Sequence, residues 1–174
     1  YEVIDTPIDI RDKDDAAEKK TFDRTIEFDD VHFKYPDGEK EAVKGFSLRV
    51  EKGQTIALVG QSGSGKSTMT NLICRFYDVT SGSIRIDGRD IRDYRQEDLR
   101  DLCGLVTQES ILFNDTIKNN LLLGKPDATD EEILRAAQVA NAYEFIEKLP
   151  NGFDTNIGDS GNRLSGGQRQ RMAI

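Results

Sequence analysis

The sequence predicts an α/β fold in which an antiparallel sheet comes first and a helical region comes last. Three observations predict this class. Apolar and polar residues alternate in two stretches between residues 25 and 50, as they do in half-buried strands. Residues 55–59 form a short apolar run that is followed by a glycine-rich loop and a helix signal. After Gln108, apolar residues recur at helical spacing.

The antiparallel part is predicted from residue 25 onward. In the first strand, four apolar residues recur at about every second position: Ile26, Phe28, Val31 and Phe33. An irregularity is expected at residues 29–30. A turn follows at residues 35–38, and a second strand is predicted over residues 42–50. A third stretch of alternation covers residues 83–87, between Gly82 and Gly88.

The remaining elements are two buried strands and several helices. Residues 55–59 and 104–107 are predicted as short strands that are buried on both faces, and residues 66–77 as a helix. Thr129 and Glu132 form a capping box at the start of a later helix. One face of that helix is expected to carry Ile133, Ala136, Ala137 and Ala140. A further helix is expected from about residue 141 and ends before residues 150–152.

Residues 1–24 are dominated by charge and predict a linker or an extended arm. Residues 25–174 are interpreted as a partial domain. The chain does not start with Met, so we expect it to be a piece of a longer protein. Its apolar runs fall far below the ~20 residues that a bilayer requires.

The charge and the cysteines restrict the function classes. A net charge of −8 argues against a nucleic-acid-binding protein, because phosphate recognition normally needs a basic face. Cys74 and Cys103 form no metal-binding or CxxC pattern, and both have apolar neighbours. Free thiols are the favoured interpretation, with a disulfide as the alternative. His32 lies on the first predicted strand and is interpreted as a partly packed strand residue.

One segment matches the phosphate-loop pattern G-x-x-x-x-G-K-[ST] at every fixed position: Gly60, Gln61, Ser62, Gly63, Ser64, Gly65, Lys66 and Ser67. Glycines let the backbone close around an anion, and the helix that follows directs its positive end at the same phosphates. Lys66 supplies a cation, and the Ser67 hydroxyl is a ligand for Mg²⁺. The pattern predicts a nucleoside triphosphate site.

A second motif near the end of the chain consists of Leu164, Ser165, Gly166, Gly167 and Gln168. Together with the phosphate loop, this LSGGQ motif resembles the ABC-transporter ATPase family. The resemblance implies a P-loop NTPase (RecA-like) core with an antiparallel β-subdomain and a helical signature subdomain, which here covers residues 111–168. It also implies ATP and Mg²⁺ as cofactors, and a head-to-tail dimer in which the signature motif of one domain meets the nucleotide of the other.

Further residues take roles from the same resemblance. Tyr35 matches the aromatic residue that stacks on adenine, and the alternative is a packing residue beside a turn. Thr68 belongs to the nucleotide-binding set. Gln108 matches the glutamine that reaches Mg²⁺ and the attacking water, so Lys66 and Gln108 are the predicted catalytic residues and Ser67 and Gln108 the predicted metal ligands.

Two segments resemble exporter-type members, in particular lipid and multidrug half-transporters. Residues 113–117 resemble the segment after the glutamine, and Asp115 is also a candidate helix N-cap. Residues 155–161 resemble the loop that contacts the coupling helices of the membrane domain, with Asp159 where the family usually has Glu. The implied partners are a second ATPase domain and a transmembrane domain fused upstream, and the implied location is the cytoplasmic face of the inner or plasma membrane.

The chain stops before the family's next elements, which are an apolar strand ending in Asp and Glu, an aspartate loop and a histidine switch. We therefore expect the final central strands to be missing and the 174 residues to bind ATP without hydrolysing it. Four apolar side chains should then lack part of their core: Ile56, Leu58, Leu105 and Val106. Two alternatives to an export motor are a soluble ABC ATPase that acts on nucleic acid or the ribosome, and a non-hydrolysing nucleotide-binding fragment.

Overall fold

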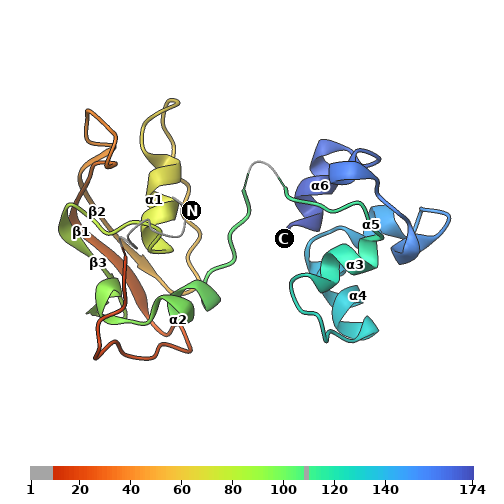
Figure 1. Cartoon of the computed structure of the whole chain (residues 1–174), viewed down its shortest axis with the longest axis horizontal. Helices are drawn as coiled ribbons and strands as arrows, with labels where there is room; N and C mark the ends of the chain where they lie inside the picture. The colour runs from red at the N-terminus through yellow and green to blue at the C-terminus, as the bar shows by residue number, and fades with distance from the viewer. Residues whose placement is uncertain (1–9, 108–109) are drawn as a thin grey trace, which may run out of the picture. The chain divides into compact units, whose positions relative to one another are not determined.

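The computed structural model describes residues 10–107 and 110–174 of the chain. The chain divides into two compact units, Tyr1–Cys103 and Gly104–Ile174, hereafter the N-terminal unit and the C-terminal unit. The N-terminal unit contains strands β1–β4 with helices α1 and α2, and the C-terminal unit contains helices α3–α6 (Figure 1). The predicted mixture of an antiparallel sheet and a helical region is confirmed.

The sheet of the N-terminal unit has the strand order β2-β1-β3-β4. Strand β1 (Thr25–Phe33) pairs antiparallel with β2 (Val43–Glu51) and with β3 (Ser81–Ile86), and β3 also pairs with β4 (Arg89–Asp90). The register of β1 shifts after Phe28, where Asp30 has a φ of 45°. The three predicted strands and the irregularity at residues 29–30 are therefore confirmed.

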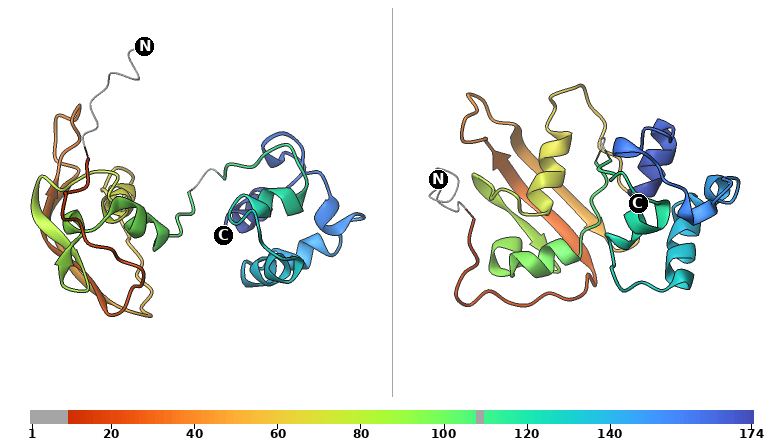
Figure 2. Two further views of the ribbon diagram at one scale, coloured as in Figure 1. Left: turned by 60° about the horizontal axis from the view of Figure 1, so that its bottom comes forward. Right: turned by 45° about the vertical axis from the view of Figure 1, so that its right-hand side comes forward.

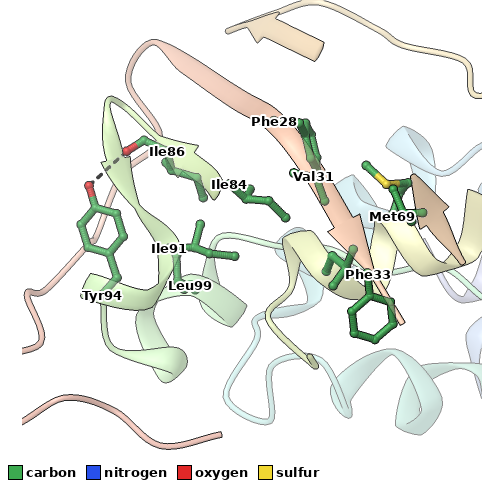
Figure 3. Packing of buried hydrophobic residues seen from close by; sticks show 11 residues of the cluster. Phe28, Val31, Phe33, Met69, Ile84, Ile86, Ile91, Tyr94 and Leu99 are labelled. Carbon is green, nitrogen blue, oxygen red and sulfur yellow. Dashed lines mark hydrogen bonds between the residues drawn. The ribbon is translucent and has the colours of Figure 1, made fainter. Parts of the chain in front are cut away.

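The core of the N-terminal unit lies between the sheet and two helices. Helix α1 (Lys66–Ile73) runs beside the sheet, and α2 (Gln96–Asp101) follows the 3-10 helix η1 (Ile91–Asp93) (Figure 2). Met69 and Leu72 of α1 are buried against side chains of the sheet. Figure 3 shows this cluster, in which the Tyr94 hydroxyl donates to the carbonyl oxygen of Ile86 at 3.1 Å. The core thus fixes the helix that follows the phosphate loop.

Two strand predictions are wrong for the described residues. Residues 55–59 and 104–107 are not part of any strand, and no parallel central sheet forms among residues 10–107 and 110–174. A parallel strand needs hydrogen-bonded neighbours on its edges, and the described strands supply none there. The expected loss of core is confirmed, since Ile56, Leu58, Leu105 and Val106 are 45%, 39%, 41% and 45% exposed.

Helix α1 ends four residues before the predicted end at residue 77. Arg75 adopts a left-handed conformation with a φ of 50°, which terminates the helix. The buried Arg75 guanidinium bonds to Asp78 at 3.1 Å and to the carbonyl oxygens of Tyr94 and Arg11, both at 3.2 Å. These long-range partners, rather than local propensity, determine where the helix ends.

Residues 10–24, the described part of the charged segment before β1, make specific contacts with the rest of the N-terminal unit. Ala17 forms an isolated parallel bridge with Tyr94, supported by hydrogen bonds from Ala17 N–H to Asp93 and from Arg95 N–H to Ala17. Lys20 forms an ion pair with the buried carboxylate of Asp98. The described part of the predicted linker, residues 10–24, therefore lies against the N-terminal unit.

The C-terminal unit is helical. Its helices are α3 (Ile117–Leu122), α4 (Asp130–Val139), α5 (Tyr143–Ile146) and α6 (Gly166–Met172), with 3-10 turns η2 (Gly152–Asp154) and η3 (Asp159–Gly161). Its core residues come from all four helices and the loops between them: Leu112, Ile117, Ala137, Ala140, Ala142, Phe145, Ile146, Ile157, Leu164 and Met172. The predicted helical region is confirmed.

Local predictions for this unit were correct for one helix cap and wrong for one buried position and another helix cap. The predicted capping box of Thr129 and Glu132 is present at the start of α4. Ala136, however, is exposed, unlike its neighbours Ile133 and Ala137. The N-cap of α3 is Thr116 and not Asp115, because the Thr116 hydroxyl accepts the N–H of Asn119 at 3.1 Å.

Both cysteines are free thiols, as favoured from the sequence. Cys74 is buried at the end of α1, and Cys103 is partly exposed. His32 is half-buried on β1 and lies beside Asp30 and Glu41 at 3.5 Å and 3.4 Å, which confirms its interpretation as a partly packed strand residue.

Candidate functional site

The phosphate loop, residues 60–67, turns sharply into helix α1. Gly63 and Gly65 have φ angles of 79° and 86°, in the left-handed region that glycine adopts without strain. Gly65 is the N-cap of α1, and no side chain caps this helix. The first-turn N–H groups and the positive end of the helix dipole are therefore available to an anion.

Lys66 is the cation of this loop. Its ammonium group donates to the carbonyl oxygens of Gly60 and Gln61 at 2.9 Å and 2.7 Å, and to the Ser64 hydroxyl at 3.2 Å. The side chain thus closes over its own loop, with the charge directed at the backbone that precedes the helix. A bound phosphate would offer this ammonium a charged acceptor in place of neutral carbonyls, which gives a stronger hydrogen bond.

A second loop, residues 35–42, lies against the phosphate loop. The Ala42 carbonyl oxygen approaches Gly65 so closely that a Cβ on Gly65 would lie only 2.5 Å from it. The loop closes through a hydrogen bond of 2.8 Å from the Ala42 N–H to the Phe33 carbonyl oxygen. Glycine at position 65 is therefore required both by the backbone angle and by the neighbouring chain.

Tyr35 lies at the start of this second loop. Its ring packs edge-to-face on Phe33 and on Tyr77, with centroid distances of 4.8 Å and 5.1 Å. Its hydroxyl lies 3.0 Å from the hydroxyl of Thr68 in the first turn of α1. The aromatic residue is thus joined by a side-chain contact to the first turn of α1, 33 positions away, directly after the phosphate loop.

A cleft of about 390 Å³ borders the phosphate loop. Its lining comes from residues 41–44 and Phe46, from Leu58 and Val59, and from the loop and α1 residues Gly63, Ser64, Gly65, Lys66 and Met69. Ser67 is exposed beside it at the start of α1. The arrangement combines a concave space, uncapped helix N–H groups and a lysine, which together suit a polyphosphate.

The LSGGQ motif opens helix α6 in the C-terminal unit. The Ser165 hydroxyl accepts the N–H of Gln168 at 3.3 Å, and the Gln168 side chain accepts the N–H of Ser165 at 2.8 Å. This capping box leaves Gly166 and Gly167 exposed in the first turn. The Leu164 side chain is only 7% exposed and belongs to the core, so it anchors the motif rather than lining its surface.

Comparison with known proteins identifies the family of this chain. The family model described as "ABC transporter" matches residues 43–174. The chain belongs to the ABC transporter family.

Its similarity to individual ABC proteins extends over the whole chain. It is 51% identical over 174 residues to a Staphylococcus aureus (strain NCTC 8325 / PS 47) protein named as a multidrug export ATP-binding/permease protein, and 50% identical to a protein of the same name from the bovine strain RF122 / ET3-1. The chain spans 30% of the length of these relatives.

A solved structure supports the same assignment. The chain superposes with a TM-score of 0.90 and 42% identity on a bacterial Atm1-family ABC exporter with ATP bound, covering 99% of this chain and 30% of that one. The predicted P-loop NTPase fold is therefore confirmed, and the resemblance to exporter-type ABC proteins is confirmed with it.

The sequence predicts the phosphate loop, Thr68, Tyr35 and Gln108 as site residues, but it does not predict the side chains that pack around them. The structure brings the phosphate loop, Thr68 and Tyr35 together, whereas Gln108 lies outside the described residues. Phe33 and Tyr77, which hold the Tyr35 ring, were not predicted as part of the site. Their aromatic character was the available signal, but no sequence spacing places residue 77 beside residue 35.

Among the described residues, no group of three or more His, Cys, Asp or Glu side chains could hold a metal ion. A magnesium site that uses Ser67, Gln108 and phosphate oxygens needs no such group, because Mg²⁺ keeps several waters and is usually bound through few protein ligands. Within the described part of the chain, every helix is too short or too polar to cross a membrane.

Proposed function

We propose that this chain is the ATP-binding motor domain of an ABC exporter. In this proposal, ATP binding and hydrolysis in a head-to-tail dimer of such domains drive the export of a substrate across a membrane. The observation that carries it is the phosphate loop, in which an uncapped α1, two left-handed glycines and Lys66 converge. The names of the similar proteins, multidrug export ATP-binding/permease proteins, support an export role.

The residues of this chain have distinct roles in the proposal. The backbone N–H groups of residues 60–68 and the Lys66 ammonium bind the triphosphate, and Tyr35 stacks on the base. Ser67 and Gln108 hold the magnesium ion, and Gln108 orients the attacking water. Bound Mg²⁺ neutralises the charge that develops on the phosphoryl oxygens.

The signature residues Leu164, Ser165, Gly166, Gly167 and Gln168 act in the partner's site. The exposed first turn of α6, with two glycines that carry no side chain, supports this role because a second backbone can approach it closely. Leu164 contributes by anchoring the motif in the core of the C-terminal unit. The partner is a second ABC ATPase domain.

The coupling to a membrane domain uses the C-terminal unit. A groove of about 730 Å³ there is lined by residues 110–112, by Asp159, Ser160 and Asn162, and by residues of α6. Asp159 is held by the Asn114 amide at 2.6 Å, which joins the two exporter-like segments. We infer that this groove faces a transmembrane domain, that residues 1–24 link to that domain, and that residues 25–174 work at the cytoplasmic face of the membrane.

The chemistry of hydrolysis needs a general base for water, and the family's Asp-Glu strand is not among these 174 residues. A chain of these residues alone is proposed to bind ATP without turning it over. A soluble ABC ATPase is less well supported, because the relatives at 50–51% identity are named as export permease proteins.

The proposal is tested by measuring MgATP affinity calorimetrically for the natural protein at its full length. Lys66→Ala removes the charged donor and should weaken MgATP binding by about 10- to 100-fold. Lys52→Ala is the matched control, since Lys52 is an exposed lysine in the turn after β2. It should change the affinity by less than twofold (~0.4 kcal/mol). No MgATP binding by the parent protein, or equal losses in both variants, would refute the proposed site.

A further inference from the structure

The hydroxyl groups of Tyr35 and Thr68 are within hydrogen-bonding distance, at 3.0 Å, and one donates to the other. We propose that Thr68 is a positioning residue for the nucleobase: its hydroxyl holds the Tyr35 ring where the base stacks. The inference rests on the proposed ATP-binding function. It adds a side-chain role for Thr68 that is separate from phosphate binding.

The contacts of Tyr35 explain why such an anchor is needed. Phe33 and Tyr77 meet the ring at interplanar angles of 81° and 86°, so both contacts are edge-to-face. Edge-to-face contacts are favourable over a range of centroid distances. The Tyr35 ring can therefore shift within its own plane without losing its contacts with Phe33 and Tyr77. A directional hydrogen bond at the far end of the side chain removes that freedom.

The place of Thr68 explains why the anchor matters for a nucleotide. Thr68 is 6% exposed and lies in the first turn of α1, directly after the phosphate loop. In a nucleotide, the base and the phosphates are covalently joined, so the surfaces that bind them must keep a fixed separation. The Tyr35–Thr68 bond joins those two surfaces, and the Ala42 carbonyl oxygen closely approaches Gly65, so the same two segments of the chain also meet at the phosphate loop.

Thr70 provides a contrast on the same helix. Its hydroxyl donates to the Lys66 carbonyl oxygen at 3.4 Å, a local bond within α1. The Thr68 hydroxyl instead bonds across to a residue 33 positions away. Thr70→Val is therefore a matched control that removes a threonine hydroxyl from α1 without touching Tyr35.

The experiment measures dissociation constants of MgATP and of magnesium tripolyphosphate for the full-length natural protein. Tripolyphosphate has no base, so the ratio of the two affinities reports the contribution of the base. Thr68→Val should lower the ATP-to-tripolyphosphate affinity ratio about fivefold, the worth of one neutral hydrogen bond. Tyr35→Phe should lower the ratio equally, Thr68→Ser should restore it, and Thr70→Val should leave it unchanged.

The double variant Tyr35→Phe/Thr68→Val gives a second test. Because both changes remove the same bond, the loss in the ratio should stay about fivefold instead of becoming about 25-fold. An unchanged ratio in Thr68→Val, or a multiplicative loss in the double variant, overturns the inference alone. Failure of the parent protein to bind MgATP overturns the proposed function, and this inference with it.

Discussion

Lys19 and Asp87 form an ion pair of 2.6 Å whose side chains are only 12% and 8% exposed. The Asp87 carboxylate also accepts the backbone N–H groups of Asp23, Arg24 and Thr25, at 3.0 Å, 2.6 Å and 3.0 Å. The Asp87 side chain, in the turn after β3, therefore supplies the hydrogen-bond acceptors for the backbone N–H groups at the start of β1. The charged segment before the sheet is held by this carboxylate as part of the fold.

The first prediction concerns this carboxylate. Asp87→Ala should lower the free energy of unfolding by about 2–4 kcal/mol, because it leaves three backbone N–H groups and the shielded Lys19 ammonium without their acceptor. Asp14→Ala, at an exposed position in the same charged segment, is the control and should change stability by less than about 0.5 kcal/mol. Urea unfolding of the full-length protein measures both. A similar small effect of the two variants would contradict the role of Asp87.

The second prediction concerns pH. Burial raises the pKa of Asp87, but hydrogen bonds from Lys19 and from the N–H groups of Thr25, Asp23 and Arg24 outweigh it, so the pKa lies well below its ordinary value. A hydrogen bond from Lys20 likewise lowers the pKa of Asp98.

Both carboxylates bind protons less readily in the folded state than in the unfolded state. Their contribution to stability is therefore complete above the ordinary aspartate pKa and is lost as the pH falls through the folded pKa values. The free energy of unfolding should begin to fall as the pH drops below about 5 and should keep falling through the ordinary aspartate range toward the lower folded pKa of Asp87, less steeply in Asp87→Asn than in the parent. Parallel curves for the two proteins would show that Asp87 does not carry this dependence.

The third prediction compares two glycines with left-handed backbone angles. Gly82 has a φ of 79°, and a Cβ there would lie 2.2 Å from the carbonyl oxygen of Asp30. Gly88 has a φ of 88°, but its Cβ would meet nothing within 4 Å. Gly88→Ala should cost about 1 kcal/mol from backbone strain alone. Gly82→Ala should cost about 3 kcal/mol or more, because the bulge of β1 must move.

Thermal unfolding of the two glycine variants distinguishes the cost of backbone strain, which both variants share, from the cost of the steric clash with Asp30, which only Gly82→Ala has. Equal shifts in melting temperature would mean that β1 and β3 do not approach as closely at Asp30 as the structure has them. A larger shift for Gly82→Ala confirms that the bulge after Phe28 is in contact with the start of β3.

The fourth prediction concerns thiol reactivity. Burial raises the pKa of the Cys103 thiol to about 11, and the neighbouring Cys74 raises it as well. At pH 8 the thiolate fraction is then on the order of a hundredfold below that of an ordinary exposed cysteine. Iodoacetamide should therefore label Cys103 slowly in the folded protein. Peptide mapping by mass spectrometry measures the rate, with urea-unfolded protein as the control, and equal rates in the two samples would contradict the prediction.

Sequence patterns predicted elements better than their ends. The strands β1 and β2 and the start of α1 follow from alternation, turn residues and a loop motif, all of which act over a few positions. The end of α1 does not, because the position of Arg75 depends on carbonyl oxygens contributed by Arg11 and Tyr94. Residues 55–59 and 104–107 were predicted as strands from their apolar character and are not strands. An apolar segment forms a strand only where a neighbouring strand can pair with it through hydrogen bonds.

By itself, the sequence determined the fold class, the phosphate loop and the membership in a family with an LSGGQ motif. These depend on local chemistry, since a glycine, a lysine or a capping serine acts within one turn of backbone. The tertiary structure alone decided that Tyr35 meets Thr68, that Leu164 is buried, and that Asp87 holds the chain before β1. Each of these depends on residues that are distant along the chain and whose meeting is set by how the elements pack.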